Sequence, residues 1–186
     1  PYTTLFRSVK LSFDYVEVAS KLGFTHRIIL VDLLGAGYSD KPLSFKYTVT
    51  SHAGYLKEFI DDLDLDKIII FGHSLGGPIA IELSNLLKDR IYKLILSESN
   101  LDPSSHGAAS FEIGHLDESD LENSFKIKLM EYERSGNTMW VATLKNWLPK
   151  AAFEISINAV SGGTPSWREF LYQFEFPKYF IFGERS

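Results

Sequence analysis

Residues 66–83 read DKIIIFGHSLGGPIAIEL and join a run of β-branched residues to an apolar helical pattern through a glycine-rich turn. The first half predicts a buried strand over 66–74, because continuous apolar runs are typical of parallel sheets covered on both faces. The second half predicts a helix over 74–90 from its apolar spacing. Ser74 stands at the junction, so the geometry of this turn decides what its hydroxyl can do.

The glycines around Ser74 have the spacing G-x-S-x-G. A strand that turns sharply into a helix holds the central residue in a strained backbone conformation. Side chains at Gly72 and Gly76 would collide with the neighbouring strand and helix, so glycine at both positions lets the serine hydroxyl project. The helix begins directly behind Ser74, which places the backbone N–H of Leu75 where it can hold an oxyanion. The pattern predicts a nucleophile; the alternative is a tight glycine turn with an incidental serine.

Strands and helices alternate on both sides of this turn. Apolar runs predict strands and 3–4 spacing predicts helices, with a glycine-rich loop at 33–40. The predicted order is helix 12–24, strand 26–32, helix 48–65, strand 66–74, helix 74–90 and strand 91–100. This alternation predicts an α/β fold whose mainly parallel sheet carries helices on both faces.

The pattern changes after residue 102, because residues 103–175 contain no clear strand. Helical periodicity covers 116–136, 138–148 and 165–174, whereas 151–160 is ambiguous. The segment 176–184 returns to the buried-strand pattern. We therefore expect a core formed by 9–102 and 176–186, interrupted by a helical cap at 103–175.

Several motifs resemble the α/β-hydrolase fold family. GHSLGG at 72–77 is similar to that family's nucleophile elbow, and DLLGAGYSDKP at 32–42 is similar to its D-x-x-G-x-G-x-S loop. LILSESN at 94–100 and FIFGE at 180–184 resemble its next two core strands, with a cap between them. The resemblance implies a partial α/β-hydrolase fold and a serine-dependent hydrolase of an ester or related acyl compound, with no cofactor. A serine at the elbow argues against haloalkane or epoxide chemistry, which uses a carboxylate nucleophile in this fold.

The resemblance also implies a base and an acid in the chain order serine, acid, histidine. No histidine follows the last predicted strand; the five are His26, His52, His73, His106 and His115. His73 is interpreted as structural, and a base from the cap would be unusual. The candidate acid is Glu98, with Asp102 nearby, Glu184 as a weaker candidate, or a carboxylate past residue 186. The alternative for Glu98 is a strand cap or a pocket wall.

The two ends of the chain predict a piece of a longer enzyme. The first eight residues, PYTTLFRS, match one reading frame of a common sequencing adapter, so we interpret residues 1–8 as non-native; residues 185–186 fit the opposite adapter. By resemblance, a central strand and a loop with the second oxyanion donor belong before residue 12. Their loss would leave two strands with unpaired edges, although residues 3–6 have the strand character to occupy that position. We expect the chain alone to be poorly stable and inactive.

Composition excludes several other classes of function. The chain has 186 residues, no cysteine and a net charge of -5. This excludes disulfides and thiol nucleophiles, and it fits a reducing compartment such as the cytoplasm. No basic run predicts a nucleic-acid or membrane partner, and no cluster has metal-ligand spacing. We expect a small-molecule substrate and leave the oligomeric state open.

Aromatic residues of the insertion allow two interpretations. They line an apolar substrate pocket beneath the cap, or they are ordinary core residues at helical spacing. These residues are Trp140, Trp147, Trp167 and Phe170. Asp32 and Asp40 are expected to brace the loop beside the turn. The competing functional class is a non-catalytic ligand-binding protein with the same pocket.

Overall fold

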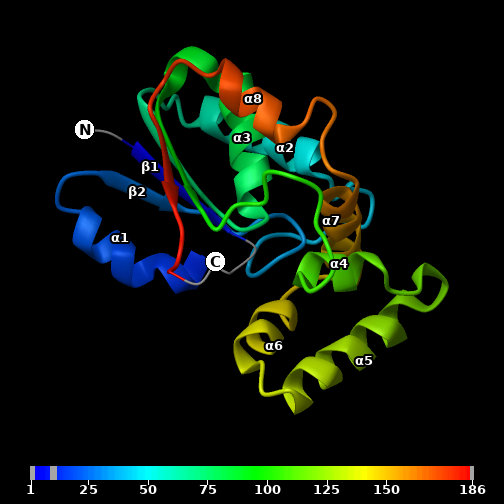
Figure 1. Cartoon of the computed structure of the whole chain (residues 1–186). Coiled ribbons are helices and arrows are strands. Elements are labelled where there is room, and N and C mark those ends of the chain that lie inside the picture. Colours follow the sequence, from blue (N-terminus) through cyan, green and yellow to red (C-terminus); the bar gives the residue numbers. More distant parts are fainter. Residues whose placement is uncertain (1–2, 9–11, 185–186) are drawn as a thin grey trace.

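The computed structural model describes residues 3–8 and 12–184 (Figure 1). These residues form a five-stranded sheet in the order β2-β1-β3-β4-β5, with every neighbouring pair parallel. The strands are β1 (Thr3–Ser8), β2 (Arg27–Leu30), β3 (Ile68–His73), β4 (Ile91–Ser97) and β5 (Lys178–Ile181). The parallel sheet predicted from the apolar runs is confirmed.

Helices cover the sheet and extend beyond it. Figure 1 shows α1 on one side of the sheet and α2, α3 and α8 on the other, which confirms the predicted α/β class. The helices near the sheet are α1 (Val16–Leu22, after the 3-10 turn Ser12–Tyr15), α2 (Val49–Asp62), α3 (Gly76–Leu87, then the 3-10 turn Lys88–Arg90) and α8 (Trp167–Gln173). Those of the insertion are α4 (Ala109–Gly114), α5 (Leu121–Arg134, after the 3-10 turn Glu118–Asp120), α6 (Thr138–Leu144) and α7 (Pro149–Ser161).

Strand β1 lies between β2 and β3 and pairs with both of them. Thr3 is in register with Arg27 on one side and with Ile68 on the other. The edges expected to be unpaired are therefore paired, and the expectation that residues 3–6 can occupy this position is confirmed. The loop expected to replace the second oxyanion donor includes residues 9–11, which lie outside the described residues.

The core is centred on β3 and α3. Ile68 and Ile70 of β3 are fully buried, as are Ile79, Ile81 and Leu83 of α3. Helix α3 packs against α2, α8 and the central strands. The residues before and after Ser74 are therefore fixed by apolar packing.

The two outer strands are less buried than their apolar sequences predict. Arg27 of β2 is exposed and the rest of that strand is half-buried. In β5, Tyr179, Phe180 and Ile181 are 43–51% exposed. The prediction of buried strands at 26–32 and 176–184 is wrong for these described residues, because each strand pairs on one side only within the described sheet.

Helix boundaries differ from the sequence expectations in physically simple ways. Helix α2 begins one residue after the predicted start at 48, because Thr48 is its cap and its hydroxyl accepts a hydrogen bond from Ser51 N. Helix α8 begins two residues after the predicted start at 165, because Ser166 caps it in a capping box with Glu169. The apolar face predicted for helix 12–24 is largely exposed, because α1 lies beside the edge strand β2.

The insertion is helical, as the absence of a strand pattern predicts. The ambiguous segment 151–160 is part of α7, and α4 was not predicted. Helix α4 packs closely on α7, whereas α8 packs on α3 of the sheet layer. The division into a core and a cap at residues 103 and 175 stays a prediction.

Candidate active site

Ser74 lies on a tight turn between β3 and α3. Its φ angle is +51°, in the left-handed region that non-glycine residues rarely adopt. Its N–H donates to the carbonyl of Ser97 on β4 at 2.9 Å, and its carbonyl accepts from Gly77 N at 2.9 Å. The side chain is half-buried. The chain thus passes from strand through a strained corner into helix, as the glycine pattern predicts.

The glycines allow this corner to close. A Cβ on residue 72 would lie 2.8 Å from Ala80 Cβ and 2.9 Å from both Gly76 O and Gly77 Cα. Two of these contacts are with backbone, which cannot move without opening the turn. A Cβ on Gly77 would overlap the side chain of Ser99, with 2.6 Å to its Cβ. The steric need for glycine predicted at position 72 is confirmed, and the same prediction for Gly76 stays a prediction. The sequence pattern did not single out Gly77, for which the doubled glycine was the available signal.

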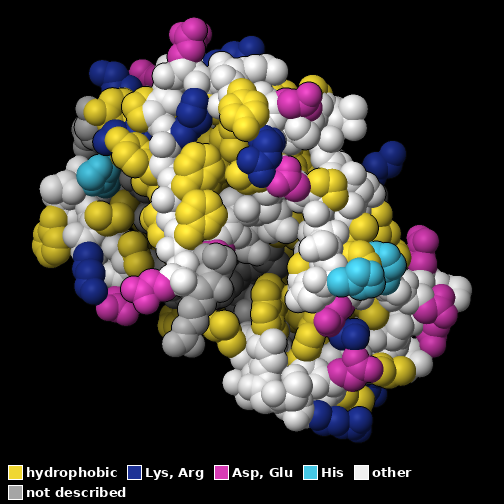
Figure 2. All heavy atoms as spheres, in the orientation of Figure 1, with side chains coloured by type: hydrophobic (Ala, Val, Ile, Leu, Met, Phe, Trp, Pro, Cys, Tyr) yellow, Lys and Arg dark blue, Asp and Glu magenta, His cyan; other side chains and the backbone are white. Residues whose placement is uncertain are grey.

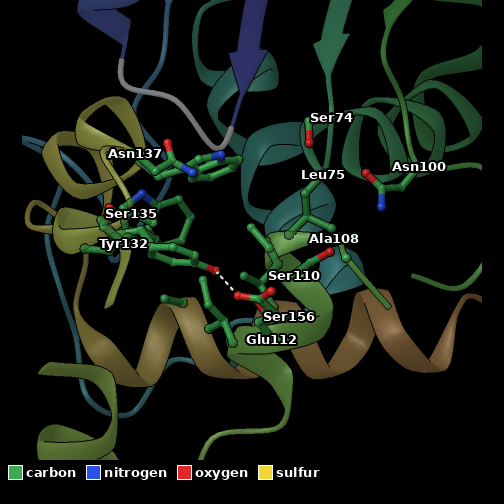
Figure 3. Close-up of a pocket in the computed structure, with 18 residues that line it drawn as sticks. Ser74, Leu75, Asn100, Ala108, Ser110, Glu112, Tyr132, Ser135, Asn137 and Ser156 are labelled. Atoms are coloured by element: carbon green, nitrogen blue, oxygen red, sulfur yellow. Dashed lines mark hydrogen bonds between the residues drawn. The ribbon is translucent and has the colours of Figure 1, made fainter. Parts of the chain in front are cut away.

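A cavity of about 450 Å³ opens beside Ser74. Figure 2 shows a hollow between the sheet layer and the helices α4 to α6, and Figure 3 shows the residues around the cavity. Its wall carries Ser74, Leu75, Asn100, Gly107, Ala108, Ala109, Ser110, Glu112, Ile113, Tyr132, Ser135, Asn137, Trp140, Leu144, Trp147, Ala152, Ile155 and Ser156. The serine of the turn therefore faces a space of the size that small-molecule sites have.

The two interpretations of the insertion aromatics overlap. Trp140 and Trp147 line the cavity, as the pocket interpretation expects, and Trp147 also belongs to the buried core. Trp167 is 1% exposed in the core, where its indole N–H donates to Glu82 at 2.9 Å. Phe170 borders a separate hollow beside α3.

The glycine-rich loop at 33–40 is hydrogen-bonded to the segment between α6 and α7. The carboxylate of Asp32 accepts from the backbone N–H of Ser12 and of Tyr38, and the carbonyl of Asp40 accepts from Gly35 N. Gly35 O also accepts from the backbone N–H of Leu148, which precedes α7, at 2.8 Å. The expected bracing role is confirmed for the side chain of Asp32. The contact of Asp40 uses its backbone carbonyl, so the role of its carboxylate stays a prediction.

The three acid candidates have different surroundings. Glu98 follows β4 with a φ of +46°, and its carboxylate accepts from Gly183 N at 2.5 Å. Asp102 forms a bidentate pair with Arg168, which lowers the pKa of its carboxyl. Glu184 is exposed. The role of Glu98 stays a prediction; Asp102 already has a cationic partner away from the cavity wall.

All five histidines lie within the described residues, and none lines the cavity. His73 lies at the end of β3 with its Nδ1 3.4 Å from Ser97 Oγ. His106 and His115 are exposed and contact the ring of Phe111, the first tilted at a centroid distance of 4.2 Å and the second stacked at 4.1 Å. The described cavity wall therefore includes the hydroxyl of Ser74 and the residue Leu75 but no histidine.

The described residues offer little for other classes of site. Within 3–8 and 12–184, no group of three or more histidine, aspartate or glutamate side chains could hold a metal ion. In the same part of the chain, no helix combines the length and apolar character that a membrane span requires. The cavity beside Ser74 remains the candidate site.

Known proteins resemble the chain at two levels. A family model described as alpha/beta hydrolase fold matches residues 9–125. Haloalkane dehalogenase 2 of Mycobacterium tuberculosis is 33% identical over 88 residues, which are 47% of this chain and 31% of that protein. A 2-hydroxy-6-oxo-2,4-heptadienoate hydrolase of Pseudomonas putida is 29% identical over 83 residues, 45% and 30% of the two chains. The matched segment spans about a third of these relatives' length.

Solved structures match over almost the whole chain at lower identity. An esterase of Exiguobacterium antarcticum superposes with a TM-score of 0.73 at 19% identity, covering 96% of this chain and 72% of the other. A thermophilic esterase of Thermogutta terrifontis gives 0.74 at 18% identity, covering 99% and 71%. At these identities the likeness is one of fold.

Proposed function

Since the chain belongs to the family that shares the alpha/beta hydrolase fold, we propose that the whole protein is a serine-dependent hydrolase of an ester or a related acyl compound. One observation carries the proposal. Ser74 has a φ of +51° on the turn between β3 and α3, and it lines a cavity of about 450 Å³. A nucleophile needs this combination of a projecting hydroxyl and a space for the acyl group.

The reaction proceeds by acyl transfer to Ser74. Its Oγ attacks the carbonyl carbon while a base takes the hydroxyl proton, and the N–H of Leu75 stabilises the negative oxygen that forms. The bond to the leaving alcohol then breaks, and the base returns its proton to the alcohol oxygen. Water attacks the acyl-serine with the same base, which releases the acid and restores the serine.

The proposed reaction also needs a base and an acid that orients this base. None of the five histidines lines the cavity, so we assign the base to a histidine outside these 186 residues. We assign the orienting acid to Glu98, because it directly follows β4, the strand beside β3, or to a carboxylate past residue 186.

The residue at the elbow favours acyl chemistry over dehalogenation. The matched dehalogenase shares 33% identity over less than half of this chain. Haloalkane chemistry in this fold uses a carboxylate nucleophile, whereas this chain has a serine at that position.

The absence of cysteine supports a reducing location, and we propose the cytoplasm.

Labelling with a fluorophosphonate tests the nucleophile in the full-length protein. We expect stoichiometric labelling that Ser74→Ala abolishes, because the probe bonds covalently to an activated serine oxygen. Ser20→Ala, at an exposed position of α1, is the matched control and should label normally. Labelling that survives Ser74→Ala would remove this residue as the nucleophile.

A ligand-binding protein without turnover is the second candidate, and the lack of a histidine on the described cavity wall favours it. The 186-residue chain is expected to show no esterase turnover for the same reason. The coding sequence downstream of residue 186 separates the two functions. A histidine codon after the strand that ends the chain supports the hydrolase, and a natural gene without one supports the binding protein.

A further inference from the structure

The end of the cavity opposite Ser74 is polar and is built by the cap. Figure 3 shows Ser74 at one end, and Glu112 with Tyr132 at the other. The Tyr132 hydroxyl donates to Glu112 Oε2 at 2.8 Å. Glu112 lies on α4 and Tyr132 on α5, so this pair joins two cap helices.

The position of Glu112 is fixed by the close packing of α4 against α7. A Cβ on Gly114 would lie 3.1–3.2 Å from the backbone of Ser156 and Ile157 on α7, so α4 and α7 approach closely. Ser156 is buried and lines the same cavity. The carboxylate is thus held by one hydrogen bond and by a helix that has little room to move.

The charge of the cavity wall has one sign. Apart from Tyr132, Glu112 is the only ionisable residue among the described residues that line the cavity. No lysine or arginine is among them. Burial and the neighbouring Glu112 raise the pKa of Tyr132, so its hydroxyl stays a neutral donor. Three aromatic rings, those of Tyr132, Trp140 and Trp147, line the same space.

The nearest cation lies outside the cavity wall. Lys128 Nζ is 3.9 Å from Glu112 Oε2 but 2.6 Å from Glu131 Oε2, so it pairs mainly with Glu131. It also lies over the Tyr132 ring, 6.0 Å from the centroid. The carboxylate of Glu112 thus lines the cavity, whereas Lys128, its more distant ion-pair partner, does not.

We propose that this end of the cavity selects substrates with a positively charged ammonium group distant from the reacting carbonyl, which Glu112, Tyr132 beside it and the tryptophan rings of the cavity wall recognise. An ammonium ion is attracted by a carboxylate and by the faces of aromatic rings. The inference rests on the proposed hydrolase for the word substrate, whereas the recognition itself requires binding alone.

Binding of a matched pair of ligands to the full chain tests the proposal without turnover. Choline carries the charge, and 3,3-dimethylbutan-1-ol has the same shape without it. Trp140 and Trp147 supply a fluorescence signal. We expect choline to bind more tightly by about three- to tenfold, with a preference that decreases as salt is added. Equal affinities, or no measurable binding of either ligand, would overturn the proposal.

Three variants locate the charge effect. Glu112→Gln keeps a hydrogen-bond acceptor for Tyr132 and should remove the preference for choline. Lys128→Gln should increase the preference for choline by about twofold, because a competing cation is gone. Glu122→Gln makes the same charge change as Glu112→Gln, at an exposed position of α5, and should leave the preference unchanged. A preference that survives Glu112→Gln in a protein with unaltered thermal unfolding contradicts the assignment.

The result separates this inference from the proposed function. Choline preference without fluorophosphonate labelling of Ser74 would refute the hydrolase and leave the ammonium site intact. Labelling of Ser74 together with equal binding of the two ligands would support the hydrolase and refute the ammonium site.

Discussion

Strands β3 and β5 have similarly apolar sequences and very different surroundings. Ile68 and Ile70 of β3 are fully buried, whereas Ile181 of β5 is 51% exposed. Strand β3 pairs on both sides and is covered by α3, but β5 pairs only with β4 in the described sheet. An apolar run therefore predicts a parallel strand, and the neighbours of that strand decide how much its side chains contribute to stability.

The largest expected effect comes from shortening matched isoleucines in the two strands. Ile70→Ala should lower the free energy of unfolding by about 2–5 kcal/mol, because it leaves a cavity in a packed core. Ile181→Ala should cost about 1 kcal/mol or less, since half of that side chain is already in solvent. Urea unfolding of both variants measures the difference, and equal losses would contradict the contrast between the strands.

The carboxyl end of β3 extends the comparison from side chains to backbone. Gly72→Ala would place a Cβ 2.9 Å from Gly76 O and Gly77 Cα, so we expect a loss of about 1–3 kcal/mol in the free energy of unfolding. Gly54→Ala is the control, because nothing lies within 4 Å of a Cβ at that position of α2. The control should gain about 0.5–1 kcal/mol from helix propensity, and a gain for Gly72→Ala as well would remove the steric argument.

The sequence predicted the centre of the molecule better than its edges. The path from β3 through Ser74 into α3 could be predicted, because glycine spacing and apolar periodicity are local signals. The exposure of β2 and β5 could not, since it depends on which strands lie beside them. Gly77 was missed because its constraint comes from Ser99, which is distant in sequence.

The helices between β4 and β5 show the same limit at the level of the site. Helical periodicity predicted α5 and α6, and the pocket role of Trp140 and Trp147 was one of two open interpretations. The pairing of Glu112 with Tyr132 had no local signal, because the two residues lie on different helices. Only the packing of α4 on α7 brings that carboxylate to the cavity.

The smallest expected effect concerns the ion pair that ties the loop after β4 to α8, the helix that precedes β5. Arg168 donates to both carboxylate oxygens of Asp102, at 3.0 and 2.5 Å, and lowers the pKa of that carboxyl. A carboxyl whose pKa is lower in the folded state stabilises the fold above its unfolded pKa of about 3.9, and this contribution disappears as the pH falls through the folded value.

Arg168→Gln should therefore lower the unfolding temperature slightly at pH 7. The difference from the parent protein should shrink as the pH falls below the unfolded pKa and vanish below the folded pKa. Both side chains are about half exposed, so solvent screening keeps the effect below that of Gly72→Ala. Arg168→Lys keeps the charge without the paired geometry, so its unfolding temperature should lie between those of the parent protein and Arg168→Gln. Thermal unfolding across pH measures all three, and a difference that persists unchanged in acid would show that Arg168 stabilises α8 by packing, independently of the charge on Asp102.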